Sequence, residues 1–128
     1  MELRFADLAG RQGLWQRDAQ GDLIILDAGL DRRSRRCVLA HELVHVERGI
    51  GFGAATPETM QREEEQVRRE VARRLVPPAE LALYLERTAD GSGITVTDVA
   101  DEFDVDTEVA AKALEIFGRL STSDSSSA

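Results

Sequence analysis

The sequence VLAHELVHV at residues 38–46 contains the pattern His-Glu-x-x-His and holds the only two histidines of the chain. On a helix, His41 and His45 lie about one turn apart on the same face, where both imidazoles can bind one metal ion. Glu42 directly follows the first histidine, beside the position where a base for a water molecule is needed. The alternative is a buried helix with two hydrogen-bonded histidines. The pattern favours the metal site.

The motif lies on a helix that we predict over residues 32–48. Asp31 or Ser34 is a suitable residue to cap its start, and Gly49 is typical of a helix end. The second half is apolar nearly all round, which predicts that it is buried.

A small sheet of two or three strands is predicted before this helix. Residues 14–17 and 23–26 are apolar-rich and flank the turn formers of residues 18–22, which indicates a hairpin with a loop longer than the tightest type. The continuous apolar run of residues 23–26 predicts a strand buried on both faces. Residues 1–13 are weakly patterned, so we predict a short helix or turn there.

A second helix is predicted from Thr56-Pro57 to Leu75, before Pro77-Pro78. Its apolar stripe consists of Val67, Val71 and Leu75. At about 100° per residue, Glu64 falls in the middle of this stripe and Glu63 at its edge.

A carboxylate directed into a core is costly unless it is paired or binds a metal. We therefore predict Glu64 as the third metal ligand. The alternative is a solvated acidic patch of residues 63–65 that pairs with Arg68 and Arg69.

The C-terminal part is predicted to be helical. Residues 79–88 form a short helix, residues 89–93 a flexible connector, and residues 97–103 and 107–120 have helix-turn-helix spacing. The serine-rich residues 121–128 are expected to be disordered. The predicted core of the helix pair is Val99, Ala100, Phe103, Val105, Val109, Ala113, Leu114 and Phe117.

Composition excludes several classes of protein. The net charge of −8 argues against general nucleic-acid binding, and the second helix of the pair has only Lys112 and Arg119 as cations. No apolar run reaches the roughly 20 residues that a membrane helix needs, and the N-terminal residues lack the layout of a signal peptide. Cys37 is the only cysteine, which fits a reducing cytosol. It lies four positions before His41, and we expect a small buried apolar residue there rather than a ligand.

Two histidines and one carboxylate make a three-ligand Zn²⁺ site with a fourth position open for water. Glu42 is then the general base that takes a proton as the water attacks a peptide carbonyl. The residue that stabilises the oxyanion stays open between Tyr84 and the arginines.

Residues 35–45, followed by Glu64-x-x-Val67 and by the Leu75-Val76-Pro77 ending, resemble the ImmA/IrrE family of zinc metallopeptidases. The resemblance covers about residues 12–88. It implies a strand pair, a His-Glu-x-x-His helix, and a second helix whose early glutamate, here Glu64, completes the site. The sequence departs from the family's usual residues before this ending, with Arg68, Arg69, Glu70, Arg73 and Arg74 in their place.

The fold expected from motif and resemblance is a mainly helical α+β, zincin-like core over residues 1–88. A helix-turn-helix-like segment over residues 89–120 and the tail 121–128 follow. The resemblance implies a cytoplasmic peptidase of bacteria, phages or mobile elements that cleaves a helix-turn-helix repressor. The alternative is a non-enzymatic, metal-stabilised regulator that binds a repressor or DNA through its C-terminal helices.

Overall fold

The structure is a computed structural model that describes residues 1–49, 56–88 and 93–126. The described residues form five helices and one three-stranded sheet, which confirms the predicted mainly helical α+β class. The chain divides into two compact units, Met1–Val67 and Arg68–Ala128. This division falls within a helix, and the division that we predicted at residues 88 and 89 stays a prediction.

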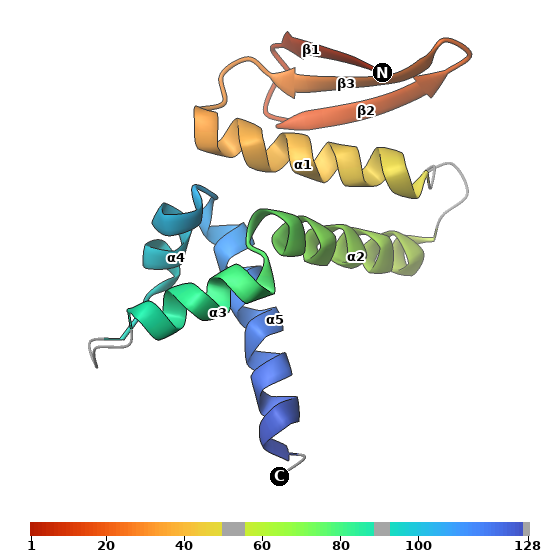
Figure 1. Cartoon of the computed structure of the whole chain (residues 1–128). Helices are drawn as coiled ribbons and strands as arrows, with labels where there is room; N and C mark the ends of the chain where they lie inside the picture. The colour runs from red at the N-terminus through yellow and green to blue at the C-terminus, as the bar shows by residue number, and fades with distance from the viewer. Residues whose placement is uncertain (50–55, 89–92, 127–128) are drawn as a thin grey trace. The chain divides into compact units, whose positions relative to one another are not determined.

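The first unit begins with the sheet, whose strands are β1 (Glu2–Ala6), β2 (Gly13–Asp18) and β3 (Gly21–Asp27). The strand order is β1-β3-β2, with β1 parallel and β2 antiparallel to β3 (Figure 1). The predicted hairpin is therefore confirmed, and the sheet has three strands.

Strand β1 replaces the short helix or turn that we predicted for residues 1–13, so that prediction was wrong. All five residues of β1 are exposed. Leu3 and Phe5 nevertheless alternate with Glu2 and Arg4, which is a local strand pattern that the prediction did not use. Its pairing with β3, for example Leu3 with Ile24, joins residues far apart in the chain. Local patterns carry no information on such a pairing.

The hairpin loop is also shorter than predicted. Asp18 pairs with Gly21, which leaves only Ala19 and Gln20 in the loop. Gly21 has φ +119°, a conformation that side chains disfavour, and the Asp18 carboxylate accepts a hydrogen bond of 2.8 Å from the Gln20 amide.

Helix α1 spans Arg32–Arg48, as predicted. The Asp31 side chain caps its start by accepting a hydrogen bond of 2.8 Å from the Ser34 amide. At its end Gly49 adopts the left-handed conformation and donates its amide to the carbonyl of His45. Both ends therefore depend on local signals.

The core of the first unit lies between α1 and one face of the sheet (Figure 1). Ile24 and Leu26 of β3 are fully buried against Val38, whereas Leu23 and Ile25 are only half-buried. The prediction of a strand buried on both faces is therefore confirmed for one face only, because α1 packs on the face that Ile24 and Leu26 share.

Helix α2 spans Pro57–Leu75, as predicted, and runs through the boundary between the two units. The Thr56 hydroxyl accepts a hydrogen bond of 3.2 Å from the Thr59 amide and so caps its start.

The second unit contains the end of α2 and the helices α3 (Pro78–Arg87), α4 (Val96–Phe103) and α5 (Thr107–Ser126). The start of α4 is a capping box in which Thr95 and Asp98 exchange hydrogen bonds. Residues 89–92 of the predicted connector lie outside the described residues.

The predicted core of the α4–α5 pair is confirmed in part. Val99, Ala100, Val105 and Ala113 are buried, but the other predicted members are half-buried. Two further residues of α5, Ala110 and Ile116, are buried and were not predicted.

Helix α5 also continues to Ser126, into the segment that we expected to be disordered. A helix can continue through Ser121–Ser126 because serine and threonine have only modestly lower helix propensity than alanine.

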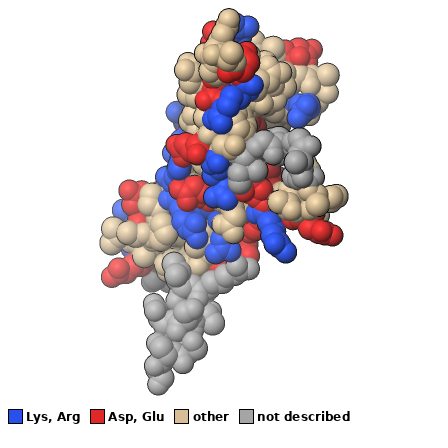
Figure 2. Space-filling view, turned by 90° about the vertical axis from the view of Figure 1, so that its right-hand side faces the viewer, with Lys and Arg blue, Asp and Glu red and all other residues tan. Residues whose placement is uncertain are grey.

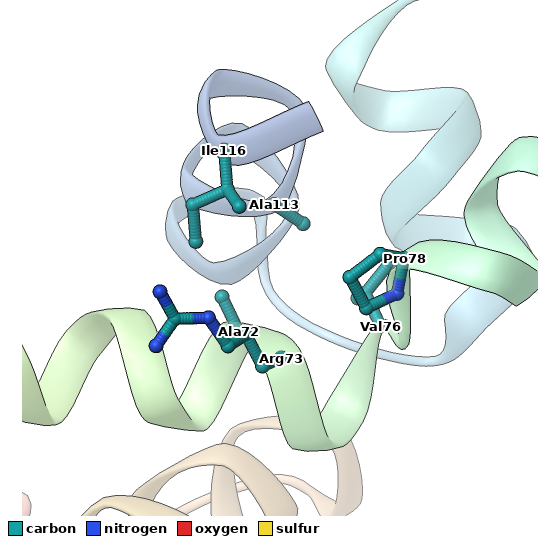
Figure 3. Close-up of a pocket in the computed structure, with 6 residues that line it drawn as sticks. All are labelled: Ala72, Arg73, Val76, Pro78, Ala113 and Ile116. Carbon is teal, nitrogen blue, oxygen red and sulfur yellow. The ribbon is translucent and has the colours of Figure 1, made fainter. Parts of the chain in front are cut away.

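Figure 3 shows a shallow hollow inside the second unit, of about 170 Å³ including open solvent, which leaves no room for a water molecule. It is a packing contact rather than a ligand site. Its lining residues are Ala72, Arg73, Val76, Pro78, Ala113 and Ile116. Among the described residues, no helix combines the length and the apolar character that crossing a bilayer requires.

Candidate metal centre

Helix α1 places the two histidines side by side. Their ring centroids are 4.7 Å apart and the rings meet edge to face. The His45 side chain is only 5% exposed, whereas that of His41 is 31% exposed. The pair is therefore covered at His45 and accessible to solvent at His41.

Helix α2 brings Glu64 to the same point. One carboxylate oxygen of Glu64 contacts Nε2 of His41, and the other lies 3.3 Å from Nε2 of His45. The three side chains offer ligand atoms that all lie within 4.8 Å of one another. Among the described residues this is the group that could hold a metal ion, and it consists of the three predicted ligands.

The donors fit a zinc ion. Catalytic zinc sites commonly use three protein ligands drawn from histidine and acidic residues, which is the donor set present here. Two imidazoles and one carboxylate also match the preference of zinc, whereas Ca²⁺ and Mg²⁺ prefer oxygen donors. Cys37 is buried, as predicted, and does not belong to the group.

Glu42 is buried next to the histidines. It is 8% exposed, and its Oε1 lies 3.4 Å from Nδ1 of His41, the ring nitrogen that does not face Glu64. Glu42 therefore lies on α1 in direct contact with His41, one of the three candidate ligands.

The two carboxylates change the protonation of His41. Burial lowers its pKa, but hydrogen bonds and charge interactions with Glu42 and Glu64 together outweigh burial, so the pKa lies above its ordinary value. A metal ion binds the neutral imidazole, so protons and metal compete for His41.

The burial of Glu63 differs from the prediction. The phase of the apolar stripe put Glu64 in the middle of the buried face and Glu63 at its edge, but Glu63 is the more buried of the two. Its carboxylate accepts two hydrogen bonds from Arg48, of 2.5 Å from Nε and 2.9 Å from the terminal NH2 group. The hydrogen bonds from Arg48 hold the pKa of Glu63 below its ordinary value. Burial acts in the opposite direction, and the positive charge of Arg48 adds to the lowering.

Arg48 is the residue near the site that the sequence analysis missed. It is the last residue of α1, one turn after His45. The signal available in the sequence was the position of Glu63 four residues before Val67, because a carboxylate that continues an apolar row requires a cationic partner.

The oxyanion residue stays a prediction. Tyr84 lies in the second unit, where its ring packs edge to face on Phe103 at 6.0 Å and Arg87 lies over it. Burial, with nearby carboxylates, raises the pKa of Tyr84. In the first unit, Arg17 pairs with Asp22 at 2.6 Å and donates a hydrogen bond to the carbonyl of Val46.

Gly13, the first residue of β2, brings the sheet against the motif helix. A Cβ atom at this position would lie 2.8 Å from Cγ1 of Val38 and 3.4 Å from Cγ of Glu42. A β-branched valine side chain has little freedom to move away. Close contact of sheet and helix above Glu42 therefore requires glycine.

We expect Gly13→Ala to lower the free energy of unfolding by about 1–3 kcal/mol, the usual cost of overpacking. Urea denaturation measures this change. The matched control is Gly118→Ala, within helix α5, where a Cβ atom meets nothing within 4 Å. The control should be neutral or more stable, and equal stability of Gly13→Ala and the wild type would contradict the close contact.

Comparison with known proteins identifies the family. No curated protein matches the chain. The family Peptidase_M78, the IrrE N-terminal-like domain, matches residues 1–115. Because this match spans most of the sequence, the chain belongs to the IrrE N-terminal-like peptidase family, which is the family that its motifs resemble.

Proposed function

We propose that this chain is a zinc-dependent endopeptidase that cleaves a helix-turn-helix repressor or a similar regulator. Membership of a metallopeptidase family implies a protein substrate. The observation that carries the proposal is the convergence of His41, His45 and Glu64, whose ligand atoms lie within 4.8 Å of one another.

His41, His45 and Glu64 would hold the zinc ion. Three protein ligands are typical of catalytic zinc, because the fourth position remains for water or substrate. When bound there, zinc would lower the pKa of a water at the fourth position toward neutrality and would polarise the carbonyl of the scissile bond. The 31% exposure of the His41 side chain leaves a side from which a peptide can approach.

Glu42 would transfer the proton. Its carboxylate accepts a proton from the attacking water and then donates it to the amide nitrogen, which leaves as a neutral amine. Its burial restricts the side chain to the vicinity of His41, as the 3.4 Å contact with Nδ1 indicates. General bases make their closest hydrogen bonds in the complex with substrate, so some reorientation of Glu42 on binding is expected.

The proposed repressor substrate and cytoplasmic location rest on the family resemblance. Charge supports a protein rather than a nucleic acid as the partner. The net charge is −8, and acidic and basic side chains are interspersed on the face shown in Figure 2. On α5, Lys112 pairs with Glu115 at 2.9 Å, which reduces its availability for a phosphate.

The proposal is tested by incubating the zinc-loaded chain with a panel of purified bacterial helix-turn-helix repressors and, separately, with unstructured casein. We expect one or a few cleaved bonds in a repressor, identified by sequencing the new N-termini, and intact casein. A chelator should stop cleavage and added zinc should restore it. Broad digestion of casein would instead indicate a general protease, and absence of cleavage throughout the panel would contradict the proposed substrate class.

A further inference from the structure

We propose that Arg48 and Glu63 form a positioning pair that determines which of two neighbouring carboxylates faces the histidines, and so sets the affinity for the metal. The proposal rests on the proposed function, because it concerns the metal site formed by His41, His45 and Glu64.

The pair joins α1 to α2 directly beside the site. Arg48 follows His45 by one turn of α1, and Glu63 immediately precedes Glu64 on α2. Arg48 donates from Nε and from its terminal NH2 group to the two different oxygens of Glu63, at 2.5 and 2.9 Å. The Glu63 side chain is 9% exposed and that of Arg48 is 37% exposed.

Two parallel hydrogen bonds define orientation as well as distance. A guanidinium that binds both oxygens of a carboxylate fixes the plane of that carboxylate, which a single bond does not do. Neighbouring residues of a helix point about 100° apart. Once Arg48 holds Glu63, the rotation of α2 about its axis is therefore restricted, and Glu64 is directed toward the histidines, 3.3 Å from His45.

The pair also removes a competing ligand. Glu63 is a buried carboxylate adjacent in sequence to Glu64, and both of its oxygens are occupied by Arg48. Without the guanidinium, Glu63 would be a buried charge without its cation, and binding a metal is one way to compensate such a charge. Loss of Arg48 should therefore both loosen Glu64 and admit Glu63 as an alternative ligand.

The experiment measures the dissociation constant of zinc by competition with a chelating dye, together with the visible spectrum of the Co²⁺-substituted chain. Arg48→Met and Glu63→Gln each remove the charged pair with little change in volume. Arg48→Lys keeps the charge but loses the two parallel bonds. The matched control is Glu70→Gln, which breaks an exposed ion pair with Arg74 within α2.

We expect Arg48→Met and Glu63→Gln to weaken zinc binding by about 10–100-fold, as is usual for groups that orient metal ligands. Arg48→Lys should recover part of this loss, and Glu70→Gln should remain within about twofold of the wild type. The Co²⁺ spectrum should change in Arg48→Met because the ligand set changes. The variant Arg48→Met with Glu63→Gln should bind zinc as Glu63→Gln does, because without the Glu63 carboxylate Arg48 has nothing to position.

The possible failures are distinguishable. A wild type that binds no zinc overturns the proposed function, and this proposal with it. If the wild type binds zinc and both Arg48→Met and Glu63→Gln bind it equally well, the proposed positioning role of Arg48 and Glu63 is overturned, but the proposed function is not. Circular dichroism of the zinc-free chains checks the fold. If Arg48→Met is unfolded, comparison of folded Arg48→Lys with the wild type decides the matter, because equal affinity and an unchanged Co²⁺ spectrum would contradict a need for two parallel bonds.

Discussion

Replacing Glu42 by Gln is expected to lower the rate of peptide cleavage by about 10²–10⁴-fold, the range that general bases contribute, while zinc binding is retained. The glutamine amide has nearly the same volume as the carboxylate, so it should fit the buried position beneath Gly13. It cannot accept the proton of the attacking water. Single-turnover cleavage of a repressor identified as a substrate gives the rate, and metal analysis of the same sample gives the zinc content.

The matched control is Glu47→Gln, an exposed position on the same helix. It makes the same chemical change at a solvent-exposed position, so cleavage should stay at the wild-type rate. Retained cleavage in Glu42→Gln would contradict the assignment of Glu42 as the base.

The non-enzymatic alternative makes the opposite prediction. If the chain acts only by binding through its C-terminal helices, regulation in cells should survive Glu42→Gln and fail when residues 95–120 are deleted. That pair of results would replace the peptidase proposal for this chain.

The sequence was sufficient where the determinants of structure are local. Both ends of α1 follow from Asp31 and Gly49, whose capping interactions involve neighbours within a few residues. The relative position of His41 and His45 follows from the helix period alone. The alternation of Leu3 and Phe5 with Glu2 and Arg4 was a local signal for β1 that the prediction did not use, whereas the pairing of β1 with β3, about twenty residues away, follows from no local pattern.

In the candidate site too, prediction from the sequence succeeded for local features and failed for a contact between two helices. Glu63, Val67 and Val71 follow one another at intervals of four, so Glu63 continues the buried row of α2. Leu75 was predicted to belong to that row but is only half-buried, and its inclusion shifted the predicted centre of the stripe toward Glu64. The proximity of Glu64 to the histidines was expected, but the partner of Glu63 lies on another helix, and no local pattern points to Arg48.

Replacing Glu64 by Ala is expected to remove the metal. The wild type should contain about one zinc per chain after purification, as a three-ligand site predicts. In the variant only the two imidazoles remain, and Glu63 is held by Arg48 and cannot readily replace the lost ligand. Affinity should fall by more than about 100-fold, beyond the range for groups that only orient ligands. Metal analysis after gel filtration and a competition titration measure both quantities.

The adjacent Glu65→Ala provides the matched control, because it removes a half-buried carboxylate one position along the same helix and should leave the zinc content unchanged. Loss of zinc in Glu64→Ala with retention in Glu65→Ala would support Glu64 as the third ligand and separate its role from the general acidity of residues 63–65. Unchanged zinc in Glu64→Ala would contradict that role and move the ligand to Glu63, Glu65 or Cys37. Of these, Cys37 would require the largest change, because it is buried and outside the group that converges on the histidines.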